Sequence, residues 1–150
     1  SLPGLADDPL SSEKYGLENA KRLAALVFHE ALCEYGQDLK HEQQLGEALA
    51  DIFTEIYTME SVIARVSQIQ SVNGASNMSS IIARIYAAES LLKMNSLSKV
   101  CLNKIFKEII PDNHLETIQQ LTSRMTLHID VISLKQELAD FMYTKKDYPF

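Results

Sequence analysis

Several residue types that characterise other classes of protein are scarce in this chain. Tryptophan is absent, and only 5 glycines and 4 prolines occur among the 150 residues. A β-sheet with many tight turns needs more glycine and proline than this, so the composition favours long helices. No apolar run reaches the roughly 18 residues that a membrane-spanning helix requires.

Positive charge is also scarce. The net charge is −6, and the basic residues are dispersed, with adjacent pairs only at Lys21-Arg22 and Lys145-Lys146. Nucleic acids and anionic membrane surfaces attract clustered lysine and arginine, so we expect no nucleic-acid partner and no membrane contact.

The length suits one domain with its own core. Residues 1–10 contain two prolines and a glycine and are expected to be the remnant of a linker, which leaves residues 11–150 as a single domain. The chain begins with serine rather than methionine, which suggests a processed product or an excised fragment. We find no signal peptide and therefore expect a cytoplasmic protein, or one of the mitochondrial matrix in a eukaryote.

A single apolar seam is the most informative pattern in the sequence. Seven apolar residues alternate spacings of four and three, which places them on one face of a long helix. These seam residues are Leu45, Leu49, Ile52, Ile56, Met59, Ile63 and Val66.

Helical periodicity predicts three long helices, at about residues 11–35, 41–71 and 77–110. The turn cluster at residues 71–77 must end the second of them. Long helices joined by short links pack antiparallel. We therefore expect an all-α, up-and-down bundle of about four main helices, completed by a fourth segment after residue 111 and a short C-terminal helix.

The expected helix ends follow from local chemistry. Ser11 or Ser12 should cap the first helix, and Gly36 should end it in a left-handed conformation. Pro111 should end the third helix, Asp112 or Asn113 should cap the fourth, and Ser133 should cap the last after an extended passage from residue 126. The expected inward residues are, in the first helix, Leu17, Ala20, Ala24, Val27, Phe28, Ala31 and Tyr35, and, in the third, Ile81, Ile85, Ala88, Leu92, Leu97, Cys101 and Ile105.

Candidate catalytic or metal-binding residues are few. A di-iron bundle needs Glu-x-x-His pairs, and none occurs. His29 and Cys33 lie four residues apart, as two zinc ligands would, but no second pair accompanies them, and we expect both to be packing residues. Cys33 and Cys101 are expected to be buried free thiols. His114 and His128 have no neighbouring nucleophile, and no glycine-rich phosphate loop can be found.

Carboxylates also occur off the seam in the second predicted helix. Asp51 and Glu55 lie four residues apart, and their like charges repel. A lysine or arginine from a neighbouring helix or domain would offset this repulsion, but the sequence does not identify one.

The polar residues around the seam carry a resemblance to a known family. Glu42-Gln43, Leu45, Leu49-Ala50-Asp51, Ile56-Tyr57, Met59 and Arg65 resemble the corresponding helix in the C-terminal extension of very-long-chain-type acyl-CoA dehydrogenases. The ending, a short helix followed by Tyr148-Pro149-Phe150, is similar to how these enzymes finish. The resemblance is tightest over residues 41–67.

The resemblance implies a division of labour within a larger FAD-dependent oxidoreductase of fatty acid metabolism. The flavin-binding segments and the catalytic glutamate of these enzymes precede the extension, so this chain should itself bind no cofactor and catalyse nothing. Its implied partners are the catalytic core of the parent enzyme and further copies in a homo-oligomer. Asp51, Tyr57 and Arg65 are the candidate docking or network residues, and we favour partners within the bundle for Asp51 and Arg65.

Two other interpretations remain open from the sequence. One is a free-standing helical module for protein–protein interaction, whose groove accepts a partner helix. The other is a small bundle enzyme that uses His29, Cys33 or Glu60 in a buried site.

Overall fold

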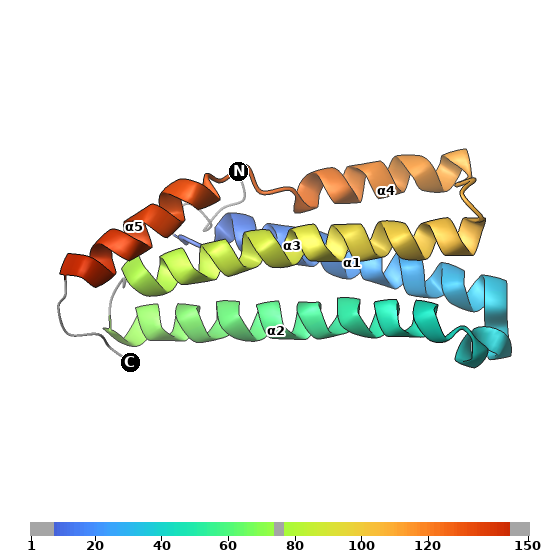
Figure 1. The fold of residues 1–150 in the computed structure, drawn as a ribbon, viewed down its shortest axis with the longest axis horizontal. Coiled ribbons are helices and arrows are strands. Elements are labelled where there is room, and N and C mark those ends of the chain that lie inside the picture. The colour runs from blue at the N-terminus through green and yellow to red at the C-terminus, as the bar shows by residue number, and fades with distance from the viewer. Residues whose placement is uncertain (1–7, 74–76, 145–150) are drawn as a thin grey trace.

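The computed structural model describes residues 8–73 and 77–144, and within these ranges it contains helices and no strands. The elements are α1 (Ser11–Tyr35), the 3-10 helix η1 (Gly36–His41), α2 (Gln43–Asn73), α3 (Asn77–Phe106), α4 (Asp112–Met125) and α5 (Val131–Thr144). The predicted all-α helical bundle is confirmed (Figure 1). Part of the predicted turn at residues 71–77, and the closing residues 148–150, lie outside the described residues.

Each of the three long helices runs antiparallel to the next along the chain. The two short helices follow one another along the side of the bundle opposite α2 (Figure 1). Helix α4 packs chiefly on α1, and α5 packs on α3. Helix α2 packs on α1, α3 and η1, and within the described residues it contacts neither α4 nor α5. Helix α2 is therefore an edge helix that is attached to the bundle from one side.

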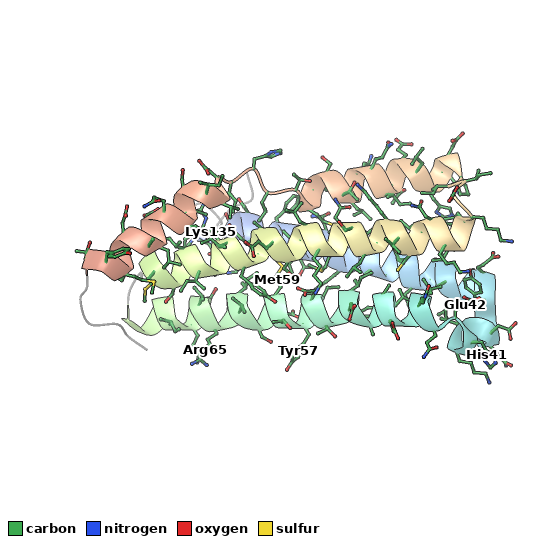
Figure 2. The ribbon with its side chains drawn as sticks, in the orientation of Figure 1. His41, Glu42, Tyr57, Met59, Arg65 and Lys135 are labelled. Atoms are coloured by element: carbon green, nitrogen blue, oxygen red, sulfur yellow. The ribbon has the colours of Figure 1, made fainter. Side chains whose placement is uncertain are left out.

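The predicted seam is confirmed as the attachment of α2. All seven seam residues are buried, from Met59 at 0% exposed to Ile56 at 9%. Met59 projects from α2 toward α3 in Figure 2. Full burial of an aliphatic side chain stabilises a fold by about 1.5–3 kcal/mol, so this stripe accounts for much of what holds α2 in place.

The inward faces of α1 and α3 differ from expectation at two positions. Phe28 and Leu92 were expected inside but are 39% and 67% exposed. Each directly follows a residue that is buried in the core, Val27 before Phe28 and Leu91 before Leu92. Successive residues of a helix point about 100° apart, so only one of each adjacent apolar pair can face the core.

Helix α1 ends at Tyr35 as predicted, but the residues expected to cap its two ends behave differently. Gly36 has a φ of +54°, which glycine adopts at little cost, but its ψ of −127° lies outside the left-handed helical region that was predicted. Neither serine caps the start: Leu10 occupies the N-cap position without a side-chain bond. The carboxylate of Asp8 instead accepts the N–H of Leu10 at 2.9 Å and forms an ion pair with Lys14.

Helix α3 ends at Phe106, four residues before the predicted end. Lys107 and Glu108 have φ values of 52° and 70°, and the N–H of Glu108 donates to the carbonyl of Asn103 at 3.0 Å. This left-handed turn ends the helix, because residues in that conformation break the helical hydrogen-bond ladder. Pro111, predicted as the stop, occupies the N-cap position of the next helix.

The predicted caps of α4 and α5 are also wrong. Asp112 is already the first helical residue of α4, and Pro111 before it, lacking a side-chain acceptor, makes no capping bond. At α5 the cap is Asp130, whose carboxylate accepts the N–H of Ser133 at 2.9 Å and its hydroxyl at 2.6 Å. The extended passage is confirmed at Thr126, but α5 begins at Val131, earlier than predicted.

We predict that the seam determines the stability of the fold. Ile52 is 1% exposed, so Ile52→Ala leaves a cavity where α2 meets its neighbours and should lower the free energy of unfolding by about 2–5 kcal/mol. The same deletion at Ile132, which is 83% exposed, should cost under about 0.5 kcal/mol. Urea denaturation of both variants measures the difference, and equal losses would contradict this account.

Candidate functional site

The family-like residues Tyr57 and Arg65 lie on the outward face of α2. Tyr57 is 73% exposed, and Arg65 is also exposed. Figure 2 shows both side chains projecting from α2 away from the other helices. Within the described residues, no hydrogen bond or ion pair involves either side chain. Both groups are therefore free to meet a surface outside the bundle.

Asp51 lies apart from these two residues, although it belongs to the same helix. Its side chain is exposed, and its negative charge contributes to raising the pKa of Lys93 on α3 after the larger effect of Glu55. Arg65 lies fourteen positions after Asp51, a rise of about 21 Å along a helix. The two cannot pair directly, so the three candidate residues do not form one cluster.

Glu55 forms the polar link between α2 and α3. Its carboxylate accepts the hydroxyl of Ser90 at 2.7 Å and the ammonium of Lys93 at 2.9 Å. Lys93 is thus a cation from a neighbouring helix that offsets the repulsion between Asp51 and Glu55. Burial raises the pKa of Glu55, but the hydrogen bonds from Lys93 and Ser90 outweigh it and lower the pKa below its ordinary value.

His29 and Cys33 were predicted to be packing residues, and this prediction is wrong, because both side chains are exposed. The Sγ atom of Cys33 lies 3.5 Å from Nε2 of His29. The expectation of two buried thiols holds only for Cys101. In the described part of the chain, no group of three or more His, Cys, Asp or Glu side chains is placed to hold a metal ion.

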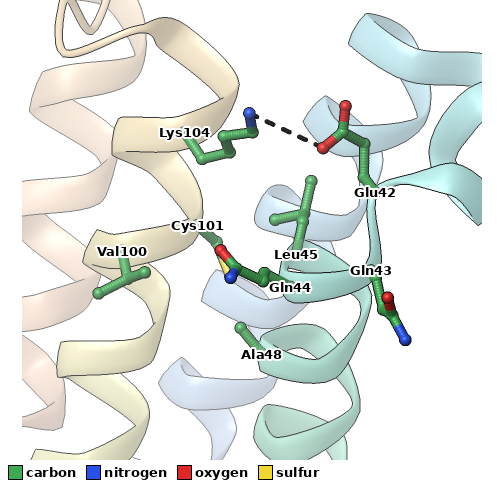
Figure 3. Close-up of a pocket in the computed structure, with 8 residues that line it drawn as sticks. All are labelled: Glu42, Gln43, Gln44, Leu45, Ala48, Val100, Cys101 and Lys104. Atoms are coloured by element: carbon green, nitrogen blue, oxygen red, sulfur yellow. Dashed lines mark ion pairs between the residues drawn. The ribbon is translucent and has the colours of Figure 1, made fainter.

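A cavity of about 290 Å³ opens where the start of α2 meets the end of α3 (Figure 3). Its wall includes Leu45, Ala48, Val100 and Cys101, and the ion pair between Glu42 and Lys104 spans 3.7 Å beside it. Burial raises the pKa of the Cys101 thiol to about 11, so the group stays protonated at neutral pH and is a poor nucleophile. The cavity therefore lacks an activated nucleophile.

His114 has a structural role at the junction of α4 with the bundle. Its ring stacks on Phe106 at a centroid distance of 5.6 Å, and Nε2 lies 3.4 Å from a carboxylate oxygen of Glu30 on α1. Glu60 also has a structural role, because its carboxylate accepts a hydrogen bond from the ammonium of Lys21 at 2.8 Å on the surface. Neither residue lies in a buried catalytic site.

An aromatic contact on the outer surface of α1 and α2 was not predicted from the sequence. The rings of Phe28 and Phe53 meet edge to face at a centroid distance of 5.9 Å, although the side chains remain 39% and 44% exposed. One signal was available in the sequence. Phe53 follows the seam residue Ile52 and therefore points about 100° away from the core.

We predict that Glu55 contributes stability that depends on pH. A carboxylate whose pKa is depressed in the folded state stabilises the fold above its unfolded-state pKa, and this contribution is lost as pH falls through the folded-state value. Glu55→Gln should therefore lower the free energy of unfolding at pH 7, and its difference from wild type should shrink in acid.

Glu47→Gln is the matched control, because Glu47 is an exposed carboxylate on the same helix. Urea titrations at several pH values test the pair. A deficit of Glu55→Gln that stays constant down to strongly acidic pH would show that the loss is one of packing rather than charge.

Comparisons with known proteins place this bundle in a family. A family model for the acyl-CoA dehydrogenase C-terminal domain matches residues 19–127. A probable acyl-CoA dehydrogenase of Bacillus subtilis (strain 168) is 26% identical over 141 residues, which are 93% of this chain and 23% of that protein.

The crystal structure of an acyl-CoA dehydrogenase complexed with FAD from Bacillus anthracis matches 99% of this chain with a TM-score of 0.83. The identity is 24%, and the match covers 27% of that chain, so the likeness shows a shared fold. This chain thus spans about a quarter of the length of each of the two proteins. Because the family model covers most of the sequence, the chain belongs to the acyl-CoA dehydrogenase C-terminal domain family.

Proposed function

We propose that this chain is the non-catalytic C-terminal domain of an FAD-dependent acyl-CoA dehydrogenase and that it packs on the catalytic core of that enzyme. The observation that carries the proposal is the family match over residues 19–127, together with a chain that spans about a quarter of its relatives. The remaining three quarters of such an enzyme would hold the flavin and the acyl-CoA thioester.

The chemistry of the described residues supports a packing role. The cavity between α2 and α3 has the protonated Cys101 in its wall, and the carboxylate of Glu60 is engaged by Lys21 at the surface. The outward face of α2 carries Tyr57 and Arg65 without partners inside the described bundle. A tyrosine and an arginine of this kind are typical of residues that anchor protein interfaces.

The proposal includes the extent, the assembly and the location of the domain. Residues 11–150 would form one domain, and residues 1–10 would end the linker from the core. The parent enzyme would be a homo-oligomer of the cytoplasm, or of the mitochondrial matrix in a eukaryote. Within the described residues, every helix is too short or too polar to cross a bilayer.

The isolated chain should be colourless and should not oxidise acyl-CoA. Flavin absorbance of the purified protein and acyl-CoA-dependent dye reduction measure these properties, with the full-length enzyme as the positive control. A stoichiometric flavin, or dye reduction by the 150 residues alone, would contradict the proposal.

Binding to the core separates this function from that of a free-standing interaction module. The chain should co-purify with a separately expressed flavin-containing core, because the proposed interface lies between them. A chain that stays monomeric beside the core would favour the free-standing module.

A further inference from the structure

One contiguous apolar surface on the bundle has no partner inside it. It comprises three exposed residues of α1 and three of α2, which we call the α1–α2 face: Ala25, Phe28, Leu32, Ala50, Phe53 and Tyr57. Residues three or four apart on a helix are surface neighbours, so each set of three forms a stripe. The contact between Phe28 and Phe53 at 5.9 Å joins the two stripes.

The composition of the α1–α2 face is that of an interface core. None of its six residues is charged, and half of them are aromatic, whereas the centres of protein interfaces are enriched in aromatic and depleted in charged residues. The ion pair between Lys21 and Glu60 lies between the same two helices beyond the face, where both charges remain accessible. A polar rim around an apolar centre is the usual anatomy of such a surface.

The two most exposed apolar residues of α3 lack this continuity. Leu92 and Val100 are 67% and 61% exposed, but the exposed lysines Lys93 and Lys99 adjoin them on the helix. A partner that covered this part of α3 would have to desolvate two ammonium groups. The α1–α2 face is therefore the less costly surface to bury.

We propose that the α1–α2 face docks on an apolar surface of the catalytic core of the same polypeptide. The inference rests on the proposed function and identifies the surface through which the domain packs on the core. About three quarters of the length of the relatives lies outside the matched region, which supplies an occupant of sufficient size. A second copy of this chain is a poorer occupant, because each copy carries a net charge of −6 and like charges repel.

Thiol accessibility in the full-length enzyme tests this assignment. Ala50→Cys places a thiol on the α1–α2 face, and Leu92→Cys places one at an exposed position of α3 as the matched control. Both sites are exposed in the isolated bundle, so neither change disturbs its core. Mass spectrometry of the corresponding peptides gives each alkylation rate, and the buried Cys101 serves as the unreactive reference.

We expect the thiol of Ala50→Cys to react at least about tenfold more slowly than that of Leu92→Cys in the native enzyme, because a covered site reacts only when the interface opens. Equal rates in denaturant would show that the thiols are intrinsically alike. A fast Ala50→Cys thiol in the native enzyme overturns the inference. Protection of Ala50→Cys that disappears on dilution assigns the face to a second copy and overturns it equally.

A protease site inserted within residues 1–10 separates failure of this inference from failure of the proposed function. If the α1–α2 face is free but the domain still co-elutes with the core after cleavage, the domain docks through another surface. If the cleaved domain elutes alone and both thiols react fast, packing on the core is itself wrong.

Discussion

Burial of one stripe of α2 between α1 and α3 is the interaction on which the rest of the structure depends. The seam is the main attachment of α2, because within the described residues this helix contacts neither short helix. The hydrogen-bonded ion pairs Lys21–Glu60 and Lys93–Glu55 connect α2 to its two neighbours across the edges of the seam. Attachment from one side leaves the opposite face of α2 available to another part of a larger protein.

The sequence predicted what depends on helical period and missed what depends on the path of the chain between helices. The seam follows from regular spacing, because a stripe at intervals of three and four can face only one way. Capping is a local competition among several polar residues, and the route of the connecting segment decides it. Asp130 therefore caps α5 in place of Ser133, and the N-cap position of α1 falls on Leu10 rather than on either serine. Phe28 is a miss of another kind, because it adjoins Val27 and only one of the two can face the core.

The candidate site was harder to predict than the fold. Tyr57 and Arg65 were recognisable by resemblance, but periodicity alone does not say whether a residue off the seam meets a neighbouring helix or faces outward. Asp51 and Arg65 differ for this reason, since only Asp51 lies near a lysine of α3. The exposed pair Phe28 and Phe53 became visible only once α1 and α2 were placed side by side.

A structure of the full-length enzyme, determined at a resolution that shows side chains, tests the central claim most directly. The account predicts that the seam of α2 faces α1 and α3 as it does here, while the rings of Phe28, Phe53 and Tyr57 contact residues of the flavin-containing core. Rings exposed to solvent in that structure, or a seam that turns toward the core, would contradict it.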